Sequence, residues 1–161
     1  EGKAGFQIMG DWAKGEFTAA GKVPGVDYYC SPTPSNNGYL YNVDSFIFYK
    51  TSDPDKQEGQ KLLAKLMMGK NFQKVFNLYK GSIPARLDVP MDEFDKCAKT
   101  SNADIKTAGA KGGLVPSFAH GMAQGNTMKA ALQDIITEHF NSDMSSVDAA
   151  NALADSVLAN M

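Results

Sequence analysis

The side chains best suited to bind a ligand in this sequence are one tryptophan, an Asn/Asp pair and a lysine. Trp12 is the only tryptophan, and an indole can either anchor a core or stack on a flat ligand. Asn42 and Asp44 lie two positions apart in an apolar stretch, where buried polar groups are costly unless they are paired or meet a ligand. Lys80 is the last residue of a predicted helix. A lysine at the C-terminal end of a helix is usually solvated and is favoured by the helix dipole. These residue types leave both a structural role and a polar-ligand site open.

The histidines and carboxylates form no recognisable catalytic or metal-binding motif. His120 has small and apolar neighbours, where a lone histidine is more often a hydrogen-bonded structural residue, and His139 is far from it in sequence. The sequence contains no Gly-x-Ser-x-Gly, His-Glu-x-x-His or Cys-x-x-Cys pattern. Catalysis by Asp11 and Asp44 would require the two carboxylates to face one another across a cleft. We therefore expect no metal, no cofactor and no enzymatic activity.

Length and composition describe an ordinary globular protein. The chain has 161 residues, of which 43% are hydrophobic and 21% charged, and its apolar runs are too short to cross a bilayer as a helix. Its net charge of −2 provides no polybasic surface, which argues against nucleic acid or an anionic membrane as the main partner. Because the chain begins with Glu1 rather than methionine, we expect processing, cleavage or design to have produced this start.

Two stretches have the alternation that is typical of strands. Residues 3–10 alternate apolar with smaller or polar side chains, which would place Trp12 just beyond a strand end. Residues 39–49 are rich in aromatic and branched side chains and form the stronger candidate. In that strand, Asn42 and Asp44 would share one face. We expect loops over 22–41, and residues 100–116 are polar and contain glycines.

Helical patterns occupy much of the remaining sequence. An oxygen cap and a proline at Ser52-Asp53-Pro54 start a helix whose apolar stripe is Leu62, Leu63, Leu66 and Met67. A second helix carries Phe72, Val75, Phe76 and Tyr79 and ends at Gly81. Three further helices are predicted: over Met91 to Lys99, from an Asn126 cap, and from a cap at Ser145 or Ser146.

Taken in order, these motifs resemble the C-terminal half of a periplasmic sugar-binding protein of an ABC importer. The resemblance is closest to the glucose-binding branch and covers essentially the whole chain, with a looser likeness to maltose-binding protein. The stretches that carry it are Gly2–Ala4, Gln7–Trp12, Asn42–Phe46, Lys80–Arg86, Phe94–Cys97 and Pro116–Gly121. It implies an α/β fold of the periplasmic-binding-protein type, in which two lobes joined by crossing strands close on a sugar.

The resemblance also implies how this chain divides. Residues 1–40 and 86–161 would belong to the C-terminal lobe. Residues 41–85 would supply a crossing strand, near Asn42 to Asp44, and a helix pair that packs on the N-terminal lobe. Most of that N-terminal lobe is not in this sequence, so we expect this helix-rich portion alone to bind sugar weakly.

Each candidate ligand residue has a role in the resemblance. Trp12 would lie against the C–H face of a pyranose, and Asp44 would accept hydrogen bonds from two adjacent hydroxyls. Lys80 would donate to a hydroxyl while lying close enough to Asp44 to offset its charge. His120 would add a hydrogen bond whose direction depends on its tautomer, and Asn42 is a weaker candidate. The expected ligand is a monosaccharide, with glucose first.

The same resemblance implies a periplasmic protein that delivers its sugar to a membrane permease. By count alone, Cys30 and Cys97 are either two separate thiols or one disulfide. The two cysteines occupy matching places in the glucose-binding branch, and a periplasmic location permits oxidation, so the resemblance implies the disulfide.

Three alternatives remain open from the sequence. The chain could bind another sugar or a short glucoside, because much of the selecting surface would lie in the other lobe. It could be a docking or assembly module whose aromatic surfaces meet protein. It could also be a lobe of a carbohydrate-active enzyme that uses Asp11 or Asp44 as an acid or base.

Overall fold

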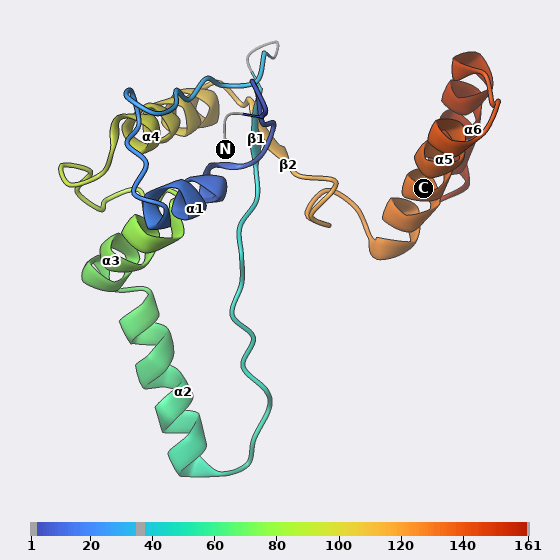
Figure 1. Ribbon diagram of the computed structural model, residues 1–161. Coiled ribbons are helices and arrows are strands. Elements are labelled where there is room, and N and C mark those ends of the chain that lie inside the picture. The colour runs from blue at the N-terminus through green and yellow to red at the C-terminus, as the bar shows by residue number, and fades with distance from the viewer. Residues whose placement is uncertain (1–2, 35–37, 161) are drawn as a thin grey trace. The chain divides into compact units, whose positions relative to one another are not determined.

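The computed structural model describes residues 3–34 and 38–160 (Figure 1). Over these residues the chain is rich in helix, with one small parallel sheet. The elements in chain order are η1 (Asp11–Ala13), α1 (Lys14–Ala19), β1 (Tyr39–Tyr41), α2 (Pro54–Met67), α3 (Lys70–Lys80), α4 (Lys96–Ala110), β2 (Leu114–Pro116), α5 (Asn126–Asn141) and α6 (Ser146–Ala159). Among the described residues, no helix is both long and apolar enough to span a membrane.

The chain divides into two compact units. The strands β1 and β2 pair with one another. One unit comprises Glu1–Tyr39 and Val43–Gly113, and the other comprises Leu40–Asn42 and Leu114–Met161. In the sheet, the amide of Tyr39 donates to the carbonyl of Gly113, and the amide of Ser117 donates to the carbonyl of Tyr41, each at 2.8 Å.

The larger unit has a small apolar core built on the start of α4 and on the loop before it. Val89, Phe94 and Ala98 are buried there, and partly buried apolar side chains pack against them: Leu78, Ile83 and Met91. The core joins the end of α3 to α4 through the intervening loop. A helix of small side chains such as α4 gains most of its stability from this packing.

An ion pair fastens α1 to the first turn of α4. Lys14 is only 5% exposed, and its Nζ lies 2.8 Å from Oδ2 of Asp95. The other oxygen of Asp95 accepts the amide of Ala98 at 2.8 Å and so caps α4. A buried ammonium is tolerated only with such a partner, so the pair specifies where the two helices meet.

The disulfide implied by the resemblance is confirmed. Cys30 and Cys97 are bonded, with their Cα atoms 5.7 Å apart, and the bond joins the loop that precedes β1 to the first turn of α4. The same loop also packs on α1, because the rings of Phe17 and Tyr28 lie 4.8 Å apart. The loop is therefore attached to both helices.

The predicted start of α2 and end of α3 are confirmed. The carboxylate of Asp53 accepts the amides of Asp55 and Lys56, and Pro54 occupies the first turn. At its other end, α3 stops at Gly81, whose φ of 88° lies in the left-handed region that glycine adopts at helix ends. Gly69 lies between α2 and α3 and is the N-cap of α3.

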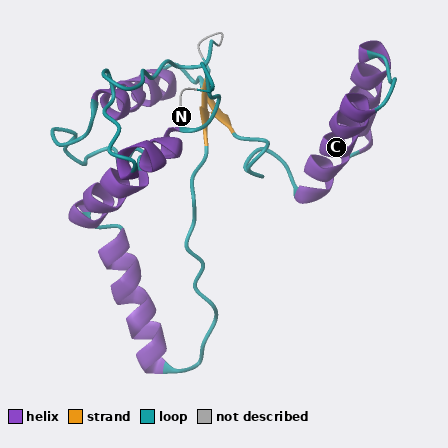
Figure 2. Cartoon of the chain, viewed as in Figure 1, coloured by secondary structure: helices purple, strands orange, loops and turns teal. Residues whose placement is uncertain are grey.

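Both strand predictions are wrong in extent. Residues 3–10 contain no strand, so Trp12 does not follow one, and the predicted strand over 39–49 is reduced to Tyr39–Tyr41. Figure 2 shows the chain continuing from β1 as a long extended loop to the start of α2. A strand exists only where a neighbour supplies ladder hydrogen bonds, and no described segment pairs with residues 42–53.

The helix predicted over Met91 to Lys99 is confirmed only from Lys96 onward, and its predicted bounds are wrong. The helix starts at Lys96, because Asp95 rather than an earlier residue satisfies the first-turn amides, and it continues to Ala110. Apolar periodicity did not predict the part of α4 beyond Lys99, because the buried face of the helix consists of small or polar side chains, Ala98, Asn102 and Ala108. Alanine needs no bulky partner and has the highest helix propensity.

In the smaller unit, α5 and α6 form a helical hairpin. The predicted cap of α6 is confirmed at Ser145, whose hydroxyl accepts the amide of Asp148 at 3.1 Å. The predicted Asn126 cap is wrong, since Gly125 holds the N-cap position and Asn126 is the first helical residue. His139 supports the turn between the helices through a hydrogen bond of 2.9 Å between its Nδ1 and the carbonyl of Met144.

Candidate functional site

The centre of the candidate site is an ion pair between Lys80 and Asp44. Lys80 is the last residue of α3, and its Nζ pairs with Oδ2 of Asp44 on the extended segment after β1. The Nζ also lies 5.8 Å from the ring centroid of Phe76, one turn earlier in α3. Both side chains remain accessible, with Lys80 30% exposed and Asp44 64% exposed. The family resemblance implies that these two residues lie close together, and the structure shows that proximity.

This pair offers complementary chemistry to a ligand that carries hydroxyl groups. A carboxylate can only accept hydrogen bonds, and an ammonium can only donate them. Adjacent hydroxyls on one molecule can do both, so one could donate to Asp44 while its neighbour accepts from Lys80. The ionised partners make such bonds about twice as strong as neutral ones.

Trp12 lies in η1, and its ring folds back over Gly10. A Cβ atom at Gly10 would overlap the six-membered part of the indole, so the absence of a side chain at this position makes room for the ring. The indole is half-buried. In the same segment, Gly15 packs so closely on α3 that its Cβ, if present, would lie 2.7 Å from the carbonyl oxygen of Lys80. Trp12 and Lys80 are therefore carried by two segments in direct backbone contact.

Asp11 is a residue of this site that sequence reasoning considered only as an acid or base. Its Oδ2 accepts the amide of Ile83 at 3.1 Å, and Ile83 lies just beyond the end of α3. Burial raises the pKa of Asp11 above its ordinary value of 3.8, against the lowering effects of the Ile83 amide and of Lys14 and Lys80. The only sequence signal was an aspartate in the first turn of a short helix, which does not identify a distant partner.

Asn42 and His120 belong to the other unit. Asn42 directly follows β1 and is half-buried. His120 is exposed in the turn after β2, and its Nδ1 shares a hydrogen bond of 2.6 Å with the hydroxyl of Ser117, which is 2% exposed. The buried hydroxyl orients the imidazole. Thus Trp12, Asp44 and Lys80 share one unit, and the other two candidates share the second.

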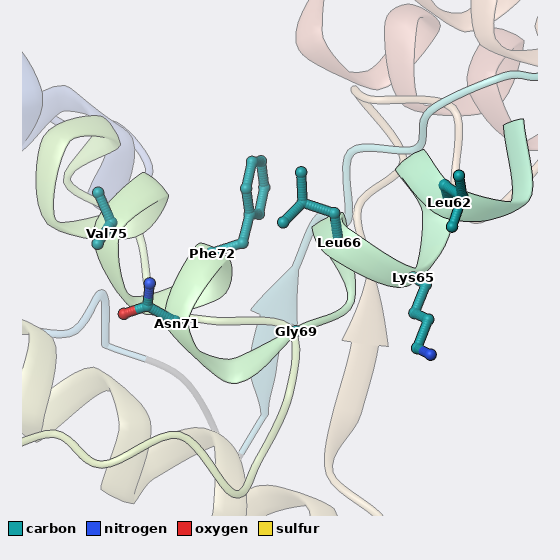
Figure 3. Close-up of a pocket in the computed structure, with 7 residues that line it drawn as sticks. All are labelled: Leu62, Lys65, Leu66, Gly69, Asn71, Phe72 and Val75. Carbon is teal, nitrogen blue, oxygen red and sulfur yellow. The ribbon is translucent and has the colours of Figure 1, made fainter. Parts of the chain in front are cut away.

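A separate apolar groove lies at the bend between α2 and α3. Figure 3 shows Leu66 and Phe72 side by side above the bend at Gly69. The groove measures about 520 Å³ and is lined by Leu62, Lys65, Leu66, Gly69, Asn71, Phe72 and Val75. In the predicted apolar stripe of α2, Met67 is buried, whereas Leu62 and Leu66 are each 60% exposed. A surface of this kind suits an apolar protein partner better than a sugar.

Among the residues that the structure describes, no group of three or more His, Cys, Asp or Glu side chains could hold a metal ion. The candidate site consists of an indole, an ion pair and a half-buried carboxylate. These groups can orient a neutral polar ligand through hydrogen bonds and apolar contact.

The chain is similar over nearly its whole length to sugar-binding proteins. It is 47% identical over 158 residues to a probable sugar-binding periplasmic protein of Brucella suis, an alignment that covers 98% of this chain. It is 37% identical over 139 residues, or 86% of this chain, to an uncharacterized ABC transporter extracellular-binding protein of Pyrococcus horikoshii. It is 27% identical over 158 residues, or 97% of this chain, to a xylose/arabinose-binding protein of Haloferax volcanii. No family model matches the chain.

The chain spans only about a third of the length of these relatives. The alignments cover 37% of the Brucella protein, 30% of the Pyrococcus protein and 33% of the Haloferax protein. The similarity therefore concerns one portion of a longer kind of polypeptide. The candidate residues Trp12, Asp44 and Lys80 all lie within this portion.

Proposed function

We propose that this chain is the C-terminal portion of the substrate-binding component of an ABC sugar importer, which captures a monosaccharide and does not catalyse a reaction. The observation that carries the proposal is the Lys80–Asp44 ion pair in one unit with Trp12. A pyranose presents adjacent hydroxyls at its edge and C–H groups on its face. The ion pair suits the edge and the indole suits the face.

Specificity would follow from pairing every buried hydroxyl of the sugar. A sugar with one hydroxyl in the wrong orientation leaves a buried polar group unpaired, which costs about 1–3 kcal/mol. Asn42 and His120 are further proposed ligands that would add two such bonds. Glucose is the first candidate, and the name of the Haloferax relative makes pentoses the next to test.

The apolar surfaces of the larger unit fit the proposed division of the molecule. We propose that residues 1–40 and 86–161 form part of one lobe and that residues 41–85 pack on the other. Phe46 and Ile47 on the extended segment are 60% and 78% exposed, and Leu62 and Leu66 at the α2–α3 groove are each 60% exposed. Exposed apolar patches of this kind mark interaction sites, so a cover from the rest of the polypeptide is expected.

The names of two relatives support a proposed location and a proposed membrane partner. The Brucella protein is named periplasmic, and the Pyrococcus protein is named for an ABC transporter. We propose a periplasmic or extracellular location for this protein, with a permease as the recipient of the sugar. The disulfide between Cys30 and Cys97 agrees with an oxidising compartment.

Isothermal titration calorimetry of the complete gene product that contains this sequence tests the proposal. Glucose, xylose and arabinose are titrated into the wild type and into Asp44→Asn. The substitution removes the charge that strengthens the hydrogen bonds to the sugar, so affinity for the bound sugar should fall about 10- to 100-fold.

Glu93→Gln is a closely matched control. Lys74, also on α3, pairs with Glu93 at 2.7 Å, and their exposed fractions of 27% and 62% are nearly those of Lys80 and Asp44. This variant should bind sugar as the wild type does. Binding of a pentose rather than glucose would retain the receptor role and change the ligand. The absence of heat with every sugar would contradict the proposal and favour the protein-docking alternative.

A further inference from the structure

The backbone of the η1–α1 segment lies directly against the end of α3. A Cβ atom at Gly15 would be 2.7 Å from the carbonyl oxygen of Lys80, and a Cβ atom at Gly81 would be 2.5 Å from the amide nitrogen of Gly15. Real Cβ atoms do not approach so closely, so both positions require glycine. Gly81 has a second requirement for glycine, because its φ of 88° lies in the left-handed region. This contact fixes the separation of the two segments at backbone distance.

A hydrogen bond fastens the same two segments a few residues away. Oδ2 of Asp11 accepts the amide of Ile83 at 3.1 Å, across 72 positions of sequence. Trp12 thus lies between Asp11 and Gly15, the two residues of its segment that contact the other segment. In the other segment, Lys80 directly precedes Gly81 and Ile83, which make these contacts.

We propose that Asp11 is a positioning residue: together with the Gly15–Gly81 contact, it holds the indole of Trp12 and the ammonium of Lys80 at a set separation. This inference rests on the proposed function, because a fixed separation matters when both groups contact one sugar ring. The Asp11 carboxylate acts through the Ile83 amide and does not contact the sugar. Its burial agrees with that role, since Asp11 is not among the exposed residues.

Two substitutions at Asp11 separate positioning from charge. Asp11→Ala removes the acceptor and leaves the Ile83 amide without it, so sugar affinity of the complete gene product should fall about tenfold or more. Asp11→Asn retains an acceptor oxygen and should keep affinity within about threefold of the wild type. Calorimetry with the bound sugar measures both. In the 161-residue chain, the emission maximum of Trp12, its only tryptophan, should shift to longer wavelength in Asp11→Ala and stay unchanged in Asp11→Asn.

A purely structural role is tested with Asp53→Ala. Asp53 also accepts backbone amides, at the start of α2, so its loss should lower stability without changing sugar affinity or Trp12 emission. If Asp11→Ala does not fold, Gly15→Ala carries the test, because its methyl group must displace the Lys80 carbonyl. Gly59→Ala is its control, since a Cβ atom there meets nothing within 4 Å.

The outcomes distinguish this inference from the proposed function. Unchanged sugar affinity and Trp12 emission in Asp11→Ala, or in Gly15→Ala if that variant replaces it, would overturn the positioning role. Equal losses of sugar affinity in Asp11→Ala and Asp11→Asn would also overturn it. If the wild type binds no sugar, the proposed function fails. The emission measurements then still decide whether Asp11 and Gly15 hold Trp12 in place.

Discussion

Lys80 is stabilised by three neighbouring features. The C-terminal end of α3 carries partial negative charge, Asp44 supplies a full one, and Phe76 offers its ring face. Lys74 on the same helix has an ion pair of similar exposure with Glu93. Exposed ion pairs such as these two contribute little to stability. The role we propose for Lys80 and Asp44 is therefore contact with the ligand.

The pH dependence of stability should be altered in opposite directions by substitutions at two aspartates. Arg86 donates two hydrogen bonds of 2.8 Å to Asp88, and these, with Lys70, hold the pKa of Asp88 below its ordinary value of 3.8. A depressed pKa contributes stability that is present above pH 3.8 and is lost as the pH falls. Asp88→Asn should therefore lose less stability than the wild type on acidification, measured as thermal unfolding midpoints from about pH 5 to about pH 3.

Asp11 provides the contrast. Burial raises its pKa above 3.8, so the folded chain binds the proton more tightly than the unfolded chain. Stability from this residue is then greatest below pH 3.8 and falls as the pH rises through the raised pKa. Asp11→Asn should remove that fall and so lose more stability than the wild type as the pH decreases. A variant whose profile runs parallel to that of the wild type would contradict the assignment for its own aspartate.

Helix α4 is the element on which the larger unit is assembled. Its first turn receives the Lys14–Asp95 ion pair from α1 and the Cys30–Cys97 disulfide from the loop before β1. Phe94 and Ala98 supply two of the buried core residues. One helix end therefore joins α1 and the loop before β1, through contacts that span 81 and 67 positions of sequence.

Removing the disulfide should lower stability without unfolding α4. The bond spans 67 positions, and in the chain-entropy model its loss in Cys30→Ala/Cys97→Ala costs about 4 kcal/mol. Urea unfolding of the variant and of the oxidised wild type measures the difference. Retention of the Lys14–Asp95 pair and of the apolar core should keep the helix content in circular dichroism.

The reduced wild type is the control for the two substitutions. It should unfold at nearly the same urea concentration as the double variant, because both lack the same covalent link. A double variant as stable as the oxidised chain would show that the bond contributes nothing to folding.

The distribution of apolar side chains shows which surfaces of the larger unit are covered. The core near α4 is small, whereas much of α2 and of the extended segment is open: Phe46, Ile47, Tyr49, Leu62, Leu66 and Met68 are each more than half exposed. Helix α2 contacts few elements besides α3. A surface of this composition is expected to be an interface.

Amide hydrogen exchange should distinguish the chain alone from the complete gene product. In the 161-residue chain, amides of residues 46–49 should exchange rapidly, because no ladder protects them among the described residues. In the complete gene product they should be protected, and Leu66→Gln should destabilise that protein by about 1–3 kcal/mol while leaving the chain alone nearly unaffected. Phe140→Gln in α5, at a side chain 87% exposed, is the control on the other unit. Equal exchange in both proteins would argue against a cover over this segment.

The sequence predicted those features that depend on neighbours within one helical turn. Asp53 and Ser145 are caps as expected, and Gly81 ends α3 as expected, because each acts on backbone groups two to four positions away. The disulfide, and the closeness of Lys80 to Asp44, were anticipated only through resemblance to a known family. The roles of Trp12 and the other candidate ligands remain predictions.

The contacts that build the site were decided by tertiary structure. Asp11 meets Ile83 across 72 positions, Lys14 meets Asp95 across 81, and Gly15 packs on Lys80 through backbone alone. Local sequence patterns do not predict contacts between residues so far apart, because an aspartate or a glycine occurs in a cap, a turn or a solvated loop alike. Strand extent has the same origin: residues 42–49 have strand-forming side chains, yet a strand requires a partner, and only Tyr39–Tyr41 finds one within the described chain.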